Sequence, residues 1–214
     1  MARIVITSGP TRQYLDPVRY LTNGSSGRMG AALAQATLDL GHEVMIISGP
    51  VSVTYPSAAK VIDVVSTQEM LDATCVAFQS ADGLIGAAAP CDYMPKNIEK
   101  NKLTKTGDGL QLSLIETPDI VATLGNAKLP GQWVVGFALE TEDIRFRAIV
   151  KMSRKCCDMI VSNSAEAMNV EDNSVEVILR DGSILETLSG PKSDVARGIL
   201  FHIQQRLIDR KNEQ

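Results

Sequence analysis

Short runs of hydrophobic residues alternate along this chain with longer segments in which hydrophobic residues recur every three or four positions. The runs are rich in valine and isoleucine and predict buried strands, whereas the periodic segments predict amphipathic helices. The predicted strands span residues 4–6, 44–47, 61–65, 84–85, 133–135 and 159–161. The predicted helices span residues 29–40, 68–78, 118–124 and 143–156. Strands and helices therefore alternate, which is typical of a parallel sheet covered by helices on both faces.

The alternation is interrupted in one segment and gives way to another pattern near the C-terminus. Residues 91–105 are polar and basic and have neither a helical nor a strand period, so they predict a loop. Hydrophobic runs at 175–179 and 184–188 flank Asp181-Gly182 and predict a β-hairpin. A helix over about 193–209 closes the chain. We therefore predict an α/β fold with a Rossmann-like, three-layer parallel sheet, followed by a C-terminal β-hairpin and helix.

Composition and charge indicate an ordinary globular protein and argue against nucleic-acid and membrane partners. The 214 residues are 44% hydrophobic and 21% charged, as in an ordinary globular protein, and we expect a single domain over residues 1–214. The net charge of −4 and an aromatic content of 4% argue against nucleic-acid binding. No hydrophobic run approaches the ~18 residues of a membrane span, and the N-terminal run is too short for a signal peptide. We therefore expect a cytoplasmic protein with no nucleic-acid or membrane partner.

Histidine and cysteine are too scarce for several common catalytic sites. The chain has two histidines and four cysteines, and no cysteine pair has the CxxC spacing of a metal or redox site. The sequence contains neither a GxSxG nor an HExxH motif. If the chain is an enzyme, its nucleophiles therefore belong to its substrates. Phosphoryl or nucleotidyl transfer suits such a site, because positioning and charge neutralisation do most of the work.

Two segments in the first half of the chain could bind an anion. Asn23–Gly30 is rich in glycine and serine and leads into a predicted helix, whose N-terminus favours negative charge. This segment is either a phosphate-binding turn or a plain tight turn with a helix cap, and its pattern is not GxGxxG. Lys96, Lys100, Lys102 and Lys105 stand in the predicted loop. They form either a lid that closes over a polyanion or a solvated run of charge.

A third basic set and two strand ends complete the candidates. Arg147, Lys151 and Lys155 are spaced by four residues and share one helix face, which either binds an anion or is solvated. Small residues end two predicted strands, at Gly86–Ala89 and Val135–Ala138. Open α/β sheets bind ligands at this edge, but small residues there also permit close packing of helices.

Seven motifs resemble, in order, those of phosphopantothenoylcysteine synthetase, and together they cover nearly the whole chain. They are Ile6–Arg12, Leu15–Tyr20, Asn23–Gly30, Ala87–Ala89 with Asp92–Tyr93, Lys102–Lys105, Thr117–Ile120 and Val135–Thr141. The chain is similar to a free-standing version of the synthetase, without the flavin-dependent decarboxylase that is often fused to it in bacteria.

The resemblance implies a ligase that joins 4′-phosphopantothenate to L-cysteine in coenzyme A biosynthesis. The substrate carboxylate would attack CTP to give an acyl-cytidylate and pyrophosphate, and the cysteine amine would then displace CMP. Bacterial members of the family generally use CTP, and animal members use ATP. Mg²⁺ or another divalent cation would reduce the repulsion between the two anions. The resemblance further implies a homodimer, with phosphopantothenoylcysteine decarboxylase as a separate partner.

The resemblance also assigns residues to roles. Asn23 and Lys102 are implied as catalytic, Asn23 by a hydrogen bond to the acyl oxygen as charge develops and Lys102 as a lid residue on the nucleotide. Nucleotide contacts are implied at Gly9, Ser25, Gly27, Gly30, Gly86, Ala87, Ala88, Asp92, Lys102, Pro118, Asp119, Ile120, Val121, Phe137, Lys151 and Lys155. Substrate contacts are implied at Asn23, Ala88, Ala89, Asp92 and Lys105, and metal ligands are unassigned.

Two other functions stay open on the residues alone. The strand and helix series with its glycine-rich turn also suits a Rossmann-like oxidoreductase that binds NAD(P), although the missing GxGxxG counts against it. A non-catalytic nucleotide-binding module would bind CTP without turnover.

Overall fold

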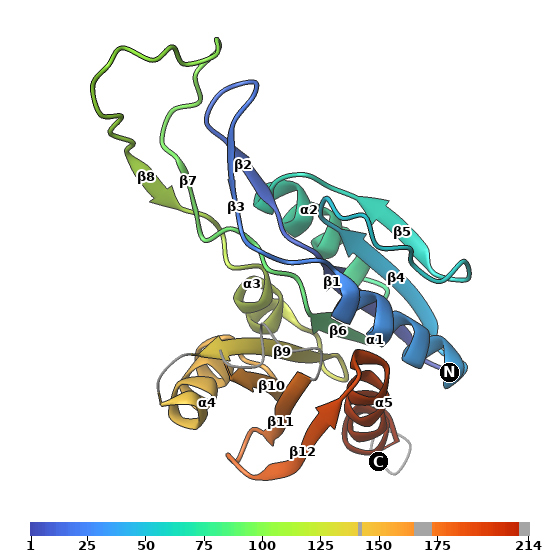
Figure 1. Ribbon diagram of the computed structural model, residues 1–214. Helices are drawn as coiled ribbons and strands as arrows, with labels where there is room; N and C mark the ends of the chain where they lie inside the picture. The colour runs from blue at the N-terminus through green and yellow to red at the C-terminus, as the bar shows by residue number, and fades with distance from the viewer. Residues whose placement is uncertain (141–142, 165–172, 210–214) are drawn as a thin grey trace.

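An eight-stranded sheet forms the centre of the computed structural model, which describes residues 1–140, 143–164 and 173–209 (Figure 1). The strand order is β12-β11-β10-β9-β6-β1-β4-β5. Neighbouring strands from β5 to β10 are parallel, and β11 and β12 extend the sheet in antiparallel pairing. The strands are β1 (Arg3–Ser8), β4 (Glu43–Ser48), β5 (Lys60–Asp63), β6 (Gly83–Gly86), β9 (Trp133–Glu140), β10 (Met159–Ser164), β11 (Asn173–Leu179) and β12 (Ile184–Gly190).

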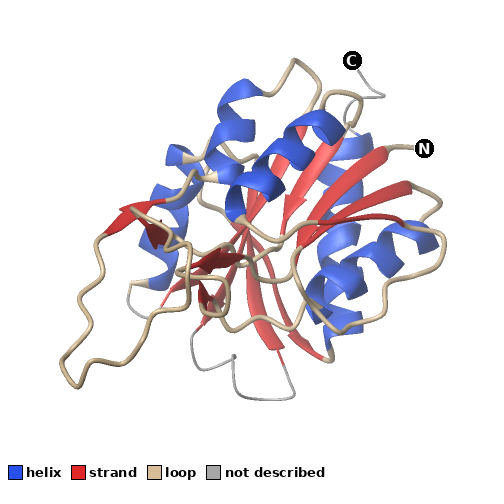
Figure 2. Cartoon of the chain, turned by 90° about the horizontal axis from the view of Figure 1, so that it is seen from above, coloured by secondary structure: helices blue, strands red, loops and turns tan. Residues whose placement is uncertain are grey.

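Helices cover both faces of this sheet (Figure 2). α1 (Arg28–Asp39) and α5 (Lys192–Ile203) pack on one face, and α5 continues into a π-helical turn over Gln204–Ile208. The other face carries α2 (Thr67–Phe78), α3 (Ile120–Ala127) and α4 (Ile144–Arg154). The predicted three-layer α/β fold is therefore confirmed, with the predicted hairpin forming an edge of the central sheet.

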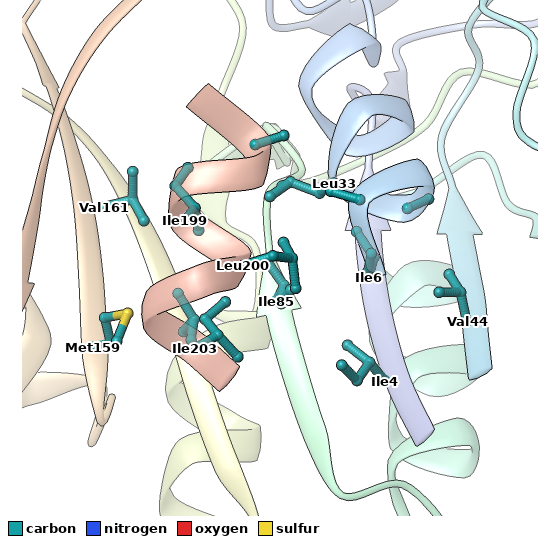
Figure 3. Packing of buried hydrophobic residues seen from close by; sticks show 14 of the residues in the cluster. Ile4, Ile6, Leu33, Val44, Ile85, Met159, Val161, Ile199, Leu200 and Ile203 are labelled. Carbon is teal, nitrogen blue, oxygen red and sulfur yellow. The ribbon is translucent and has the colours of Figure 1, made fainter. Parts of the chain in front are cut away.

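The hydrophobic core has one half on each face of the sheet because successive strand residues point to opposite sides. Ile4 and Ile6 of β1 pack under α1 and α5, whereas Val5 belongs to the core on the other face. Figure 3 shows Ile199 and Leu200 of α5 packed against the strands on the first face. The central strands are hydrophobic throughout because both of their faces are buried.

Local sequence signals set the helix boundaries. Ser66 and Glu69 form a capping box at the start of α2, because the Ser66 side chain accepts the Glu69 N–H at 3.1 Å and the Glu69 carboxylate accepts the Ser66 N–H at 3.0 Å. Asp119 caps α3 by accepting the backbone N–H of Ala122 at 3.0 Å. Gly27, with φ 73°, precedes α1 in a left-handed conformation that favours glycine.

Two small sheets were not predicted from the pattern. A hairpin of β2 (Arg12–Tyr14) and β3 (Tyr20–Thr22) lies between β1 and α1. β7 (Tyr93–Pro95) pairs with β8 (Leu114–Glu116), so the predicted loop over 91–105 is wrong in its first part. Three-residue strands are too short to show a period, and the pairing partner of β7 lies about twenty residues away in sequence.

Residues 96–113, which we call the arm, leave the body of the molecule between β7 and β8 (Figures 1 and 2). They contain no helix or strand and run beside the β2–β3 hairpin. Among the described residues, no helix is long and hydrophobic enough to cross a membrane.

Candidate functional site

A cavity of about 640 Å³ opens at the carboxyl-terminal edge of the central strands. The chain proceeds from β1 outward through β4 and β5, and then returns to place β6 on the other side of β1. Open α/β sheets bind ligands beside such a reversal of strand order. The cavity is lined by Thr7, Asn23, Gly24, Ser25, Met29, Gly86, Ala87, Ala88, Ala89, Pro90, Asp92, Tyr93, Glu116, Thr117, Pro118, Asp119, Ile120, Val121, Phe137, Ala138, Lys151, Lys155 and Asn163.

The wall formed by the segment after β6 is held by backbone and hydroxyl groups. The backbone N–H of Ala89 donates to the Gly9 carbonyl at 2.9 Å, and the N–H of Cys91 donates to Thr11 Oγ1 at 2.8 Å. Thr11 in turn contacts Thr67 Oγ1 at 2.7 Å, and both threonines are buried. A buried network in which each polar group has a partner rigidifies its surroundings. The segment is therefore fixed on the β1 side of the cavity.

Asn23 follows β3 directly, at the cavity rim. Its Nδ2 donates to the Pro90 carbonyl at 2.8 Å and lies 3.5 Å from the Ala89 carbonyl. An amide nitrogen carries two hydrogens, so the short bond uses one of them and leaves the other with a long, weak contact. The side chain is exposed and lies on the lining of the cavity. It is thus oriented by the protein and retains a donor for a ligand.

The cationic wall comes from Lys151 of α4 and from Lys155, the C-cap residue of that helix. Lys155 Nζ lies 3.0 Å from Asp119 Oδ2, while Asp119 Oδ1 caps α3. A second cavity of about 480 Å³ adjoins the first, shares both lysines, and adds Arg147 and Arg154. A polyanion in the main cavity would lie beside this group of basic side chains.

The glycines of the site are required chiefly by close packing. A Cβ on Gly86 would lie 2.6 Å from Val121 Cγ2 of α3, and a Cβ on Gly136 would lie 3.0 Å from Cys157 Sγ. A Cβ on Gly30 would lie 2.1 Å from Ser8 Oγ. Ala87, Ala88 and Ala89, in contrast, line the cavity. Both interpretations of the small residues at the strand end of β6 therefore apply, packing at Gly86 and ligand access at the alanines.

Most of the residues predicted for the site meet at the main cavity. The predicted nucleotide-contacting residues that line it are Ser25, Gly86, Ala87, Ala88, Asp92, Pro118, Asp119, Ile120, Val121, Phe137, Lys151 and Lys155. The predicted substrate-contacting residues that line it are Asn23, Ala88, Ala89 and Asp92. Gly9, Gly27, Gly30, Lys102 and Lys105 are outside the lining, and Thr141 of the last motif lies outside the described residues.

Sequence reasoning missed Asn163, which stands near the carboxyl end of β10 and lines the cavity. Its Oδ1 is buried and has no hydrogen-bond partner within the part of the chain that the structure describes. A buried acceptor without a partner is costly, which makes it a candidate contact for a ligand donor. Its place just after the predicted strand 159–161 is the signal that could have identified it.

Cys157, whose Sγ packs against Gly136 of β9, is not an activated nucleophile. Burial raises the pKa of the Cys157 thiol to about 12, against a smaller opposing effect of Lys155. Among the described residues, no group of three or more histidine, cysteine, aspartate or glutamate side chains is arranged to hold a metal ion. The cavity can orient ligands through Asn23 and neutralise anions through Lys151 and Lys155.

One family model matches nearly the whole chain. The family model described as DNA/pantothenate metabolism flavoprotein C-terminal domain matches residues 1–207. The chain is 40% identical over 205 residues to the coenzyme A biosynthesis bifunctional protein CoaBC of Bacillus subtilis (strain 168), covering 94% of this chain and 50% of that protein. The chain thus spans about half the length of the curated relatives that it matches.

Solved structures show the same fold. The crystal structure of the C-terminal domain of a CoaBC protein has a TM-score of 0.83 and 37% identity, covering 97% of this chain and 98% of that chain. A mutant of Cab2 in complex with phosphopantothenate-cysteine has a TM-score of 0.84 at 15% identity, covering 99% of this chain and 88% of that one. At that identity, the second likeness shows the fold alone.

Proposed function

Because the chain belongs to the family of the DNA/pantothenate metabolism flavoprotein C-terminal domain, we propose that it is a phosphopantothenate–cysteine ligase of coenzyme A biosynthesis. The relatives named for coenzyme A biosynthesis support this proposal, since one of them is 40% identical to the chain. The observation that carries the proposal is that Asn23, the alanines after β6, and two lysines at the C-terminal end of α4 line one cavity.

The proposed reaction has two steps. A carboxylate oxygen of 4′-phosphopantothenate attacks the α-phosphorus of CTP, the bond to the oxygen bridging to the β-phosphate breaks, and pyrophosphate leaves. The amine of L-cysteine then attacks the acyl carbon and loses a proton as CMP leaves. Lys151 and Lys155 would neutralise phosphate charge in the first step. Asn23 would donate its remaining N–H to the acyl oxygen in the second step, where negative charge develops.

The acidic side chains at the cavity suit a divalent cation that arrives together with the nucleotide. Asp92, Glu116 and Asp119 line the cavity, and Asp119 is already paired with Lys155. Mg²⁺ commonly keeps several waters and binds through one or two carboxylates together with substrate phosphates. We therefore propose that Mg²⁺ enters with CTP, with Asp92 or Glu116 as the available protein ligands. The ion would neutralise phosphate charge when bound.

The position of the arm lysines supports a site that is formed by two chains. Lys102 and Lys105 are outside the cavity lining of one chain, and the arm leads away from the sheet (Figure 1). We propose a homodimer in which the arm contributes Lys102 and Lys105 across the interface. Exposed hydrophobic side chains along β7, β8 and the arm support such a contact, at Tyr93, Ile98, Leu110, Leu112, Leu114 and Ile115.

Asn23→Asp tests the chemical assignment. We expect this variant to form acyl-cytidylate and to convert it slowly, because the carboxylate cannot donate the hydrogen bond that Asn23 provides. Quenched reactions analysed by mass spectrometry would show an acyl-cytidylate peak in the variant and little in the wild type. An unaltered overall rate in Asn23→Asp would exclude this role for Asn23.

Lys102→Ala tests the role of the arm in the first step. We expect pyrophosphate release to slow and the KM for CTP to rise, because a cation near the nucleotide is lost. Unchanged CTP saturation would refute the assignment of Lys102.

Tight binding of NAD(P) without CTP binding would instead favour an oxidoreductase, and CTP binding without turnover would favour a nucleotide-binding module.

A further inference from the structure

The carboxylate of Asp16 is a polar centre that the proposed reaction does not use. Its side chain is fully buried and lies just after β2, within the β2–β3 hairpin. Oδ1 accepts the backbone N–H groups of Val18 and Arg19, both at 2.8 Å. Oδ2 accepts Arg19 Nη1 at 2.7 Å and the backbone N–H of Leu103 at 3.1 Å. One carboxylate thus organises the hairpin turn and also binds the arm.

The charge on Asp16 is stable over the working pH range of most enzymes. Burial alone raises the pKa of this carboxyl group, but the N–H donors of Val18, Leu103 and Arg19 and the guanidinium of Arg19 outweigh burial and lower the pKa to about 2. Hydrogen bonds to an ionised carboxylate are stronger than those between neutral groups. The contacts with the hairpin and with the arm are therefore charge-assisted.

Leu103 is held at both polar groups of its backbone. Arg19 Nη1 donates to the Leu103 carbonyl at 3.0 Å, while Asp16 accepts the Leu103 N–H. Between Lys96 and Glu116, all of which the structure describes, Leu103 is the one residue that is not exposed. The Asp16–Arg19 pair therefore replaces, for this one residue of the arm, the hydrogen bonds that a neighbouring strand would provide.

The two strands of the hairpin are held together at the end that leads to the cavity. Thr22 at the end of β3 donates its hydroxyl to the Thr11 carbonyl at 2.8 Å, and the Arg12 guanidinium lies 4.5 Å from the centre of the Tyr20 ring. The next residue along the chain is Asn23. The same hairpin therefore leads to Asn23 at the cavity. It also binds the arm at Leu103, the residue that follows Lys102.

We propose that Asp16, together with Arg19, is a positioning residue that sets the location of Lys102 by binding the backbone of Leu103. The proposal rests on the function proposed above for Lys102, and it adds a residue that touches neither substrate nor nucleotide. Fixing Leu103 restricts the backbone of the residue bonded to it, so less conformational entropy is lost when Lys102 meets the nucleotide. Asp16 thus acts through the arm and not on the reacting atoms.

Limited proteolysis tests the contact without any assay of function. Trypsin cleaves after lysine, and the Lys102–Leu103 bond lies directly beside the Asp16–Arg19 pair. We compare wild type with Asp16→Asn, and use Asp108→Asn as the matched control because Asp108 is an exposed aspartate of the same arm. Rates are taken from the peptides that end at Lys102, with unfolding curves recorded to show that each variant is folded.

We expect Asp16→Asn to increase cleavage after Lys102 by about tenfold, since a charged hydrogen-bond acceptor of the Leu103 N–H is lost. Asp108→Asn should cleave at the wild-type rate. Equal rates for wild type and folded Asp16→Asn would overturn the proposal. If Asp16→Asn does not fold, Arg19→Gln replaces it, because that change removes the cationic donor to the Leu103 carbonyl and leaves the carboxylate in place. Equal cleavage in folded Arg19→Gln would then overturn the proposal.

A double-mutant cycle with Lys102→Ala separates positioning from a general structural role. We expect Asp16→Asn to lower kcat/KM for CTP in pyrophosphate release by about tenfold when Lys102 is present. In the Lys102→Ala background, Asp16→Asn should have little further effect, because the residue it positions is gone. Equal losses in both backgrounds would overturn the proposal. A wild type that releases no pyrophosphate would overturn the proposed function, and with it the role of Lys102, whatever the proteolysis shows.

Discussion

Gly86→Ala is expected to destabilise the protein by displacing α3 from the strand beneath it. The added Cβ would lie 2.6 Å from Val121 Cγ2, about 1 Å inside the ordinary contact distance between carbon atoms, and 3.6 Å from the Val135 carbonyl oxygen. Overpacking of this kind costs about 1–3 kcal/mol. For a chain of this size, that loss lowers Tm by about 3–10 °C. The start of α3 lines the cavity, so catalysis should fall together with stability.

Val121→Ala provides the matched control for this prediction. Alone, it should cost about 0.5–1.5 kcal/mol, because Val121 is half-buried and loses two methyl groups. In Gly86→Ala/Val121→Ala the clashing Cγ2 is absent, so the two losses should not add, and the coupling energy should exceed about 1 kcal/mol. Urea unfolding of the wild type and the three variants measures these terms. Additive losses would refute the conclusion that Gly86 is required by the packing of Val121.

Three further outcomes are expected. Asn163→Ala should leave the free energy of unfolding within about 1 kcal/mol of wild type, because the buried Asn163 Oδ1 has no partner among the described residues. The same change should raise the KM of a substrate that donates a hydrogen bond to this oxygen. Unchanged KM values for all substrates would contradict this prediction. Lys155→Ala should raise the KM for CTP by about tenfold. It should cost little stability, since the partly exposed ion pair of Lys155 with Asp119 contributes under about 1 kcal/mol. A large fall in Tm without a kinetic effect would contradict this prediction. Because folding lowers the pKa of Asp16 from 3.8 to about 2, its charge stabilises the protein above about pH 4, and this contribution is lost as pH falls through about 2. The stability difference between wild type and Asp16→Asn, measured by urea unfolding, should therefore be constant at neutral pH and shrink below about pH 4, and a difference independent of pH down to about 2.5 would refute the reasoning.

The layers of the fold could be predicted because the strands and helices show their periods locally. Val5 between Ile4 and Ile6 is buried on the opposite face of β1, so a continuous hydrophobic run is the pattern of a strand covered on both sides. The pairing of β7 with β8 depends on contacts between residues such as Met94 and Ile115, which lie far apart in sequence. A strand of three residues does not contain that information.

Site residues that stand in motifs or on a helix face could be predicted from the sequence, whereas those whose role depends on tertiary packing could not. Asn23, Asp92 and Lys155 stand in motifs or on a helix face, and the fold brings them to one cavity. Asn163 stands alone in its segment, and its unpartnered oxygen is a property of the packed structure. Gly30 lacks a side chain because it packs closely against Ser8. The two residues lie in distant segments, so a glycine-rich pattern does not reveal this contact.

The hairpin between β1 and α1 changes the interpretation of the glycine-rich turn. In a dinucleotide-binding fold the glycine turn joins the first strand directly to its helix. Here β2 and β3 intervene, and they carry the Asp16–Arg19 pair toward the arm and Asn23 toward the cavity. This insertion gives a physical reason why the GxGxxG pattern is missing from a Rossmann-like sheet.

Pyrophosphate release is the measurement that tests the central claim most directly. Purified protein is given Mg²⁺ and either CTP or ATP, with and without 4′-phosphopantothenate and with and without L-cysteine. A ligase that forms an acyl-nucleotide is expected to release pyrophosphate only when phosphopantothenate is present, to do so for a first turnover without cysteine, and to favour CTP. Folded protein that releases no pyrophosphate with either nucleotide would contradict the proposed function.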